Sequence, residues 1–452
     1  MDVQQLKRVY FVGIGGIGMS ALARFFKQRG AIVSGYDRTE TDLTKKLVSE
    51  GIGVHYADDL SLLDKEAELV VYTPAIPAGH QELNWYRDNG YKVYKRSDVL
   101  QWITEAMFAI TVGGTHGKTT ISTLTAYLLR ETGYGCNAFL GGISVNYDSN
   151  YWSSDNNVAV IEADEYDRSF LKLFPDIAVL TAMDPDHLDI YGTPEQMEEA
   201  FIQYTRNIKP GGTIIAKHGL RRGHELEGSK KITYSLQNDA ADVYASNIVQ
   251  QDGGYVFDIM GKGWMIQDIH LPVGGMHNVE NAVVAVTIAH LLEIDPTLIR
   301  QALTGFKGIK RRFEYVVKND KMVYIDDYAH HPEELAALIK SAKRLFPDRK
   351  CVVAFQPHLF SRTRDLADGF AESLDLADQV ILLDIYPARE LPMEGVTSQM
   401  IADRMGNPAH TILGKEGLLE FVKAAPLSLF ITAGAGDIDK LVQPIKKILE
   451  QK

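Results

Sequence analysis

The stretch over residues 107–128 constrains the fold more than any other part of the chain. An apolar run over 107–112 predicts a short buried strand, and glycines follow it. Lys118, Thr119 and Thr120 come next, at the start of a segment whose apolar residues recur at helical spacing. This order is that of a phosphate-binding P-loop, in which a strand is followed by a glycine loop, a lysine next to a hydroxyl residue, and a helix.

The residue types of this loop suit the phosphates of a nucleotide. Glycines let backbone N–H groups close around phosphate oxygens, and the start of a helix adds a favourable partial positive charge. Lys118 can reach the outer phosphates, and the Thr119 hydroxyl suits Mg²⁺. The match departs from the usual GxxxxGK[ST], because Val112 stands where the first glycine belongs. We interpret the loop as a phosphate site rather than as a turn needed for packing alone.

Length, charge and cysteine content limit the class of protein. A chain of 452 residues predicts about three domains at roughly 150 residues each. The formal charge of −12 argues against a general binder of nucleic acid or of anionic membranes. Cys136 and Cys351 form no CxxC pair, which indicates a reducing compartment. We see neither a secretory signal nor the ~20 apolar residues of a spanning helix, and we expect a cytoplasmic protein.

A second glycine-rich turn lies near the N-terminus. An apolar strand over 9–12 runs into the sequence GIGGIG, and a helical segment follows. The next predicted strand ends at Asp37, about 20 residues past the glycines, where an acid can bind a ribose hydroxyl. Taken alone this fingerprint favours NAD, or glycines that serve only tight packing. Further strands over 69–72 and 92–94 predict a Rossmann-like first domain that ends before the P-loop.

Two more strands of the middle region are predicted to end in polar residues. The strand over 157–161 ends at Glu162, and the strand over 177–181 is followed by His187. Because the carboxyl ends of parallel strands form the ligand edge of an open sheet, both side chains should lie near Lys118. This convergence is the strongest argument for a nucleotide site that the residues alone provide.

The same edge predicts a metal site. A carboxylate and a threonine hydroxyl can hold Mg²⁺ against the β- and γ-phosphates, which assigns Thr119 and Glu162 as ligands. His187 is an unusual ligand for Mg²⁺ and points to a second, softer site or to Mn²⁺ as an alternative. Glu165 and Asp167 complete the acidic run, and they are equally compatible with a solvated loop.

The remaining chain predicts two further features. Short strands separated by glycine and charge, from about 213 to 270, predict a small antiparallel insertion in the middle domain. Asn278 and Asn281 open an apolar helix, where they could be caps or could present amides to a purine. Glycine and charge over 305–313 indicate a domain junction, and strands alternating with helices beyond it predict a third α/β domain.

The ordered set of motifs resembles that of the Mur ligases over essentially the whole chain. The motifs are GIGGIGMS, GTHGKTT, EADEYD, DPDHLDIYG, HNVENA, IKRRFE, DDYAHHP, FQPHLFSRTRD, LLDIYPARE and GAGDI, in that order. The resemblance implies a Rossmann-like UDP-sugar domain over 1–106, a central ATP-binding domain over 107–312 and a C-terminal α/β domain over 313–452 that closes over ATP and an amino acid.

The resemblance also implies an activity. It is the ATP-dependent ligation of L-alanine to the lactyl carboxylate of UDP-N-acetylmuramate, through an acyl phosphate, in peptidoglycan precursor synthesis. Mg²⁺ would assist, and the protein would be a monomer or homodimer with no nucleic-acid partner and no membrane insertion.

Roles follow residue by residue from the matching motifs. The UDP-sugar would contact Gly13, Gly15, Gly16, Gly18 and Asp37. ATP would contact Gly114, Thr115, His116, Gly117, Lys118, Thr119, Thr120, Asn278, Asn281, Arg312 and Asp327. The catalytic set would be Lys118, Glu162, His187, Arg312 and His330, and the amino acid would meet His358 and Arg362. Leu359 departs from the pattern, because the family commonly has an arginine there.

Three alternatives differ in function. A recycling ligase that joins a whole peptide to the same UDP-sugar shares the P-loop and the N-terminal glycines. An NAD-dependent oxidoreductase would explain GxGxxG and Asp37, but it leaves the P-loop, Glu162 and His187 without a purpose. A nucleotide-gated binding protein would bind nucleotide without catalysis, whereas in a ligase His187 or His330 could serve as the base that deprotonates the amine.

Overall fold

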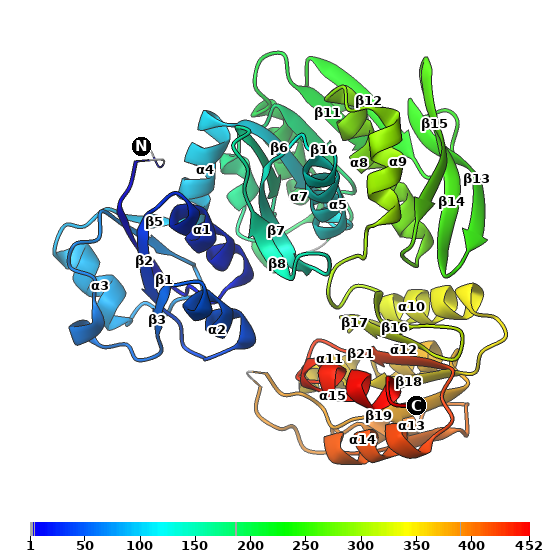
Figure 1. Ribbon diagram of the computed structural model, residues 1–452. Coiled ribbons are helices and arrows are strands. Elements are labelled where there is room, and N and C mark those ends of the chain that lie inside the picture. The colour runs from blue at the N-terminus through cyan, green and yellow to red at the C-terminus, as the bar shows by residue number, and fades with distance from the viewer. Residues whose placement is uncertain (1–2, 4, 186–187, 389) are drawn as a thin grey trace. The chain divides into compact units, whose positions relative to one another are not determined.

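The computed structural model describes residues 3, 5–185, 188–388 and 390–452, and their strands form three sheets (Figure 1). The chain separates into two compact units. The first comprises Met1–Ser246, Asp258–Asp268 and Glu280–Leu303, and the second comprises Asn247–Phe257, Ile269–Val279 and Thr304–Lys452. The predicted domain boundaries at 106 and 312 stay predictions.

The first sheet is parallel throughout, with the strand order β3-β2-β1-β4-β5. This order is the Rossmann order for five strands, so the predicted fold of this region is confirmed. The strands are β1 (Arg8–Val12), β2 (Ile32–Tyr36), β3 (Gly53–His55), β4 (Leu69–Tyr72) and β5 (Val93–Lys95). The helices are α1 (Ile17–Gln28), α2 (Asp42–Ser49), η1 (Leu60–Leu62), α3 (Gln81–Asp88) and α4 (Arg96–Ala106).

The second sheet has the P-loop strand β6 between β9 and β10, in the order β15-β14-β13-β12-β11-β10-β6-β9-β7-β8. Its strands are β6 (Phe108–Gly113), β7 (Asn137–Ser144), β8 (Ser149–Trp152), β9 (Val158–Glu162), β10 (Ile177–Leu180), β11 (Thr213–Lys217), β12 (Lys230–Ser235), β13 (Val243–Gln251), β14 (Gly254–Gly261) and β15 (Trp264–Leu271). The helices are α5 (Lys118–Glu131), η2 (Ser169–Lys172), α6 (Leu188–Tyr191), α7 (Pro194–Arg206), η3 (Gly223–Glu225), α8 (Met276–Leu291) and α9 (Pro296–Thr304). Both neighbours of β6 are parallel to it, as predicted.

The antiparallel part of this sheet is smaller than the sequence predicts. β11 runs parallel to β10, and β12 runs parallel to β11. For β11 the reason is the helical crossover α7, and for β12 it is the connection over 218–229 that contains η3; each returns the chain to the starting edge before the next strand. Within residues 213–271, the consecutive strands β13, β14 and β15 are joined by two-residue turns, which connect antiparallel strands.

The third sheet, in the order β16-β17-β21-β18-β19-β20, is parallel except for β16, and it confirms the predicted third α/β region. Its strands are β16 (Glu314–Lys318), β17 (Val323–Asp327), β18 (Cys351–Phe355), β19 (Gln379–Leu382), β20 (His410–Ile412) and β21 (Leu429–Ala433). The helices are α10 (Pro332–Leu345), α11 (Phe360–Asp365), α12 (Ala367–Leu374), α13 (Gln399–Ala402), α14 (Lys415–Ala424) and α15 (Asp439–Leu449).

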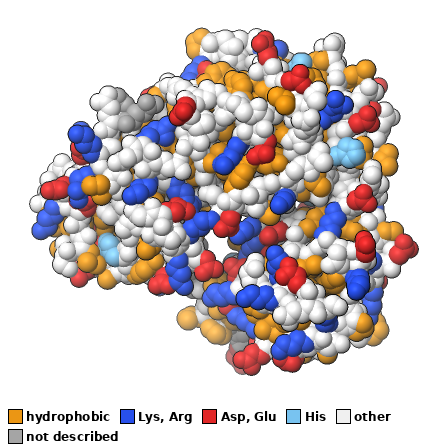
Figure 2. All heavy atoms as spheres, viewed as in Figure 1, with side chains coloured by type: hydrophobic (Ala, Val, Ile, Leu, Met, Phe, Trp, Pro, Cys, Tyr) orange, Lys and Arg blue, Asp and Glu red, His pale blue; other side chains and the backbone are white. Residues whose placement is uncertain are grey.

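Acidic and basic side chains are intermixed on the face seen in Figure 2. No helix within the described parts of the chain is long and apolar enough to cross a bilayer.

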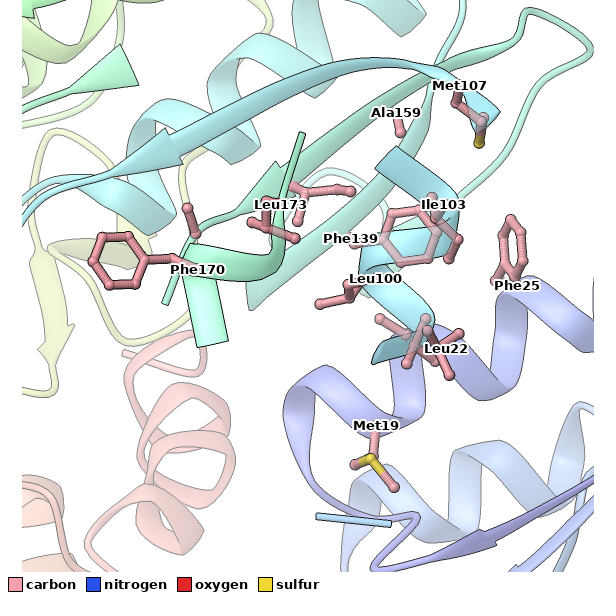
Figure 3. Close-up of a cluster of buried hydrophobic side chains, with 14 of the residues drawn as sticks. Met19, Leu22, Phe25, Leu100, Ile103, Met107, Phe139, Ala159, Phe170 and Leu173 are labelled. Atoms are coloured by element: carbon pink, nitrogen blue, oxygen red, sulfur yellow. The ribbon is translucent and has the colours of Figure 1, made fainter. Parts of the chain in front are cut away.

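One apolar core connects the first sheet's helices with the second sheet (Figure 3). Leu22 and Phe25 of α1 belong to it together with Leu100 of α4 and Phe139 of β7. The rings of Phe25 and Phe139 lie 5.3 Å apart, centroid to centroid. Burying such aromatic rings stabilises the contact by about 1.5–3 kcal/mol for each large side chain. The helix that begins at the N-terminal glycine turn is therefore packed on the P-loop sheet.

Candidate functional site

The P-loop joins β6 to α5 through two glycines that no other residue could replace without strain. Gly117 immediately precedes α5 with φ +79°, and Gly114 has φ +118°. A β-carbon at Gly114 would lie 2.8 Å from the backbone nitrogen atoms of Thr181 and Ala182, which follow β10. Gly117, the residue before α5, has no side chain that could cap the helix, so the loop presents a helix N-terminus of the kind that binds phosphate.

Lys118, the first residue of α5, is held by two oxygen atoms. Its Nζ donates to the Gly114 carbonyl oxygen at 2.8 Å and to Glu165 Oε1 at 2.7 Å. Glu165 is 1% exposed. Burial raises the pKa of Glu165 above its ordinary value, and the charge of Lys118 opposes that shift. The interpretation of Glu165 as a solvated residue is wrong, and its place three residues after the strand-end acid Glu162 is the only signal in the sequence.

Thr119 and Glu162 meet as predicted. The Thr119 hydroxyl donates to Glu162 Oε1 at 3.1 Å, and the Gly141 N–H donates to Glu162 Oε2 at 3.2 Å. Two hard oxygen atoms at the edge of a phosphate loop fit the ligand preference of Mg²⁺. The residues that the structure describes contain no group of three or more acidic, His or Cys side chains placed to hold a metal. The predicted third ligand, His187, lies outside the described residues.

A small cavity reaches Glu162 from the start of α1. It has a volume of about 110 Å³ and is lined by Ile17, Gly18, Ala21, Arg96, Leu100, Phe139, Leu140, Gly141, Ile161, Glu162 and Asp164. At its charged end, Arg96 Nη2 lies 3.5 Å from Asp164 Oδ2. The cavity therefore connects the N-terminal glycine turn with the acid beside the P-loop.

In the N-terminal turn, most backbone N–H groups are already bonded. Those of Gly13 and Ile14 donate to the Tyr36 carbonyl oxygen at 2.8 and 2.9 Å. The Gly15 N–H donates to Asp37 Oδ2 at 2.7 Å, so the predicted ribose-binding acid also fixes the turn. Helix α1 begins after Gly16 without a side-chain cap. The N–H groups of its first turn are the ones that can meet an anion.

The two predicted asparagines have different surroundings. A β-carbon at Gly117 would lie 2.9 Å from Asn281 Oδ1, so Asn281 lies against the P-loop. Asn278 Nδ2 donates to the Gly274 carbonyl oxygen at 2.6 Å, before the start of α8. Asn281 is therefore brought to the predicted site, and Asn278 supports the turn that precedes its helix.

The predicted ATP contacts Arg312 and Asp327 also differ in their surroundings. Asp327 is bonded to the chain around it, since it accepts the N–H groups of Phe313 at 2.6 Å and Ala329 at 2.7 Å. Burial raises the pKa of Asp327 to about 6. Arg312 is exposed, whereas its neighbour Arg311 binds Asp326 Oδ2 at 3.3 Å and the Gly434 carbonyl oxygen. The sequence did not single out Arg311, which fixes the junction to the third sheet.

The third sheet gathers the other predicted residues at its carboxyl edge. The rings of His330 and His358 lie 6.3 Å apart, and His358 stacks on Tyr386 at 5.9 Å. His358 Nδ1 is buried without a hydrogen-bond partner among the described residues. Burial lowers the pKa of His358, and the charge of Arg362 on α11 lowers it further. Two imidazoles and a guanidinium therefore share one small region.

The protein has a P-loop at the carboxyl ends of the strands of a largely parallel sheet, together with a Rossmann-like sheet and a third α/β region. These features define a nucleotide-binding protein of the multidomain α/β class.

The chain belongs to the Mur ligase family. The family's catalytic domain matches residues 8–107, its middle domain residues 112–289, and its glutamate ligase domain residues 311–436. The chain is 47% identical to the UDP-N-acetylmuramate–L-alanine ligase of Cytophaga hutchinsonii, covering 100% of this chain and 99% of that one. It is 48% identical to the enzyme of the same name from Parabacteroides distasonis, covering 99% and 98%. A crystal structure of UDP-N-acetylmuramate–alanine ligase from Thermotoga maritima matches with a TM-score of 0.82 and 28% identity, over 99% of this chain and 100% of that chain.

Proposed function

We propose that this protein joins L-alanine to the lactyl carboxylate of UDP-N-acetylmuramate at the expense of ATP, as a cytoplasmic step of peptidoglycan precursor synthesis. The observation that supports this most is an identity of 47–48% with ligases of that name over almost the whole of both chains. Lys118 at the start of α5 and the paired Thr119 and Glu162 support the use of ATP at the P-loop.

In the first step the lactyl carboxylate attacks the γ-phosphorus of ATP, which yields an acyl phosphate and ADP. This step needs positioning and charge neutralisation rather than covalent help from the protein. Lys118 supplies positive charge at the outer phosphates. Thr119 and Glu162 would hold Mg²⁺, which when bound neutralises charge on the β- and γ-phosphate oxygens.

The UDP-sugar is proposed to bind with its diphosphate at the start of α1. The first-turn N–H groups of α1 suit a diphosphate, and Asp37 lies close to the same turn. The cavity between Gly18 and Glu162 offers a path for the lactyl end toward the P-loop edge.

In the second step the amine of L-alanine attacks the acyl carbon, a C–N bond forms, and the C–O bond to phosphate breaks. Arg362 is proposed to hold the alanine carboxylate, because a guanidinium can donate two parallel N–H bonds to it. The amine must lose a proton, for which His330 and His187 are the candidates. Asn281 is proposed on the adenine side of ATP, with Asn278 and the exposed Arg312 as further contacts.

ADP release measured with each substrate omitted in turn tests this function. We expect ADP to form only when ATP, UDP-N-acetylmuramate and L-alanine are all present. Stimulation by a tripeptide in place of L-alanine would identify the recycling ligase instead. Reduction of NAD⁺ would favour an oxidoreductase, and nucleotide binding without ADP formation would indicate a binding protein.

A further inference from the structure

The P-loop lysine has a carboxylate partner that the proposed mechanism does not use. Lys118 and Glu165 form an ion pair at 2.7 Å, with side chains 14% and 2% exposed. Charges removed from water interact much more strongly than a surface pair does. Any anion that binds the Lys118 ammonium therefore competes with the Glu165 carboxylate.

The chain around Glu165 holds it firmly. The Tyr191 hydroxyl donates to the Glu165 carbonyl oxygen at 2.6 Å, and the Arg168 N–H donates to the same oxygen at 3.0 Å. The preceding residue is anchored too, because the Ser169 hydroxyl donates to the Asp164 carbonyl oxygen at 3.0 Å. With its backbone fixed on both sides, Glu165 has little freedom to follow Lys118 if the lysine moves.

The second carboxylate oxygen is a further sign that this group has a role beyond packing. Glu165 Oε2 is buried and has no hydrogen-bond partner within the described part of the chain. A buried acceptor without a partner is unfavourable by about 1–3 kcal/mol, so a carboxylate kept in this way calls for an explanation.

We propose that Glu165 is a positioning residue that holds the Lys118 ammonium against the P-loop and competes with nucleotide phosphate for it. The ammonium has three N–H donors, and Gly114 O and Glu165 Oε1 accept two of them. A phosphate oxygen that arrives at the loop then shares the ammonium with a carboxylate of the same sign. The carboxylate orients the lysine for catalysis and at the same time weakens the binding of nucleotide. This inference rests on the assignment of ATP to the P-loop.

Glu165→Gln separates orientation from charge, because glutamine keeps the shape and one acceptor oxygen but lacks the negative charge. We expect Mg-ADP to bind roughly 3- to 10-fold more tightly, as expected for removal of one partly screened charge, and kcat to fall. A group that only stabilised the fold would leave the affinity unchanged or lower it. Asp167→Asn is the matched control, since this exposed carboxylate of the same loop accepts the Ser169 N–H at 3.1 Å and lies outside the Lys118 pair.

Isothermal titration calorimetry with Mg-ADP on the full chain provides the test. The gain in affinity from Glu165→Gln should be absent in a Lys118→Met background, and Asp167→Asn should match the unsubstituted protein. Weaker or unchanged ADP binding by Glu165→Gln would overturn the proposal and leave the proposed function standing, as would failure of that variant to fold. If the unsubstituted protein bound no Mg-ADP, the proposed function itself would fail, and this inference with it.

Discussion

The first compact unit contains two glycine-rich turns that look alike in sequence, one leading into α1 and one leading into α5. Each follows a parallel strand, and each helix begins after a glycine without a side-chain cap. Both helix starts therefore offer backbone N–H groups to an anion.

The two turns differ in the side chains around them. The P-loop has Lys118 and Thr119 on its helix, each paired with a carboxylate. The N-terminal turn has the N–H groups of Gly13 and Gly15 bonded to the chain itself, and the Arg96 guanidinium lies against Gly18. A positively charged side chain and paired oxygen atoms suit phosphates that react, whereas a turn fixed by its own hydrogen bonds suits a diphosphate that is only bound. Glycine spacing identifies an anion site, and the neighbouring side chains determine its chemistry.

The largest expected effect comes from Lys118. Lys118→Met combined with Glu165→Gln should lower kcat by about 1000-fold, because a charged contact in the phosphoryl-transfer transition state is lost. Lys118→Ala alone should in addition lower the free energy of unfolding by about 3–5 kcal/mol, since it leaves a buried carboxylate without its partner. Steady-state kinetics and urea unfolding measure the two effects.

Lys45→Met is the control for that experiment, because Lys45 is an exposed lysine whose ion pair with Glu40 lies on the surface. It should change neither quantity measurably. Near-normal turnover in the Lys118 double variant would show that Lys118 does not distinguish the chemistry of the P-loop from that of the N-terminal turn.

A second comparison replaces one glycine in each turn. Gly117→Ala should lower the free energy of unfolding by about 1–2 kcal/mol or more, because its φ is +79° and Asn281 Oδ1 would lie 2.9 Å from the new β-carbon. Gly16 has φ −64°, and beyond its chain neighbours the nearest described atom to the same position is the Gly13 carbonyl oxygen at 3.6 Å, so Gly16→Ala should change stability by less than about 0.5 kcal/mol. If Gly117→Ala and Gly16→Ala lowered the free energy of unfolding equally, in thermal or urea unfolding, the two turns would not differ in the backbone conformation that they require.

A third prediction concerns a residue outside both turns. Arg362→Lys should raise KM for L-alanine by roughly 10-fold, as expected for a lost charge-assisted bond, while KM for ATP and for the UDP-sugar change much less. Arg364→Lys on the same helix is the control, because Arg364 is exposed and paired with Asp365. Leu359→Arg should leave KM for L-alanine equal or lower. Leu359 already has φ +70°, so an arginine at this position adds no new backbone strain. An unchanged alanine KM in Arg362→Lys would place the amino-acid site elsewhere.

The smallest expected effect is a ligand-induced shift at the N-terminal turn. UDP-N-acetylmuramate should raise the Tm of the protein, by mass action, and NAD⁺ should not. Asp37→Asn should reduce that shift only slightly, because asparagine retains an oxygen that can accept the Gly15 N–H. Stabilisation by NAD⁺ alone would instead support the oxidoreductase interpretation of the same glycines.

The local sequence was sufficient to predict the strands and helices whose apolar residues recur at a regular spacing. The strand and helix on either side of the P-loop were predicted, as was the meeting of Thr119 with Glu162, because adjacent parallel strands end at one edge. The prediction that β11 and β12 are antiparallel was wrong, since the sequences of short strands do not distinguish parallel from antiparallel neighbours.

The contacts that the sequence missed are long-range pairs of polar groups. Glu165 lies 47 residues from Lys118, and Gly15 lies 22 residues from Asp37. In each case the local pattern was compatible with a solvated acid or a ligand contact, and only the tertiary fold shows that the carboxylate binds a neighbouring loop.

Calorimetric titration of two variants with two ligands tests the central claim most directly, namely that each glycine turn binds its own substrate. One variant combines Lys118→Met with Glu165→Gln, and the other is Gly16→Asp, which places a negative charge at the start of α1. We predict that the first loses affinity for Mg-ATP and the second for UDP-N-acetylmuramate, each by about 10-fold or more, while binding of the other ligand changes by less than about threefold. Loss of UDP-N-acetylmuramate binding in the P-loop variant, or of Mg-ATP binding in Gly16→Asp, would contradict the assignment of the two turns.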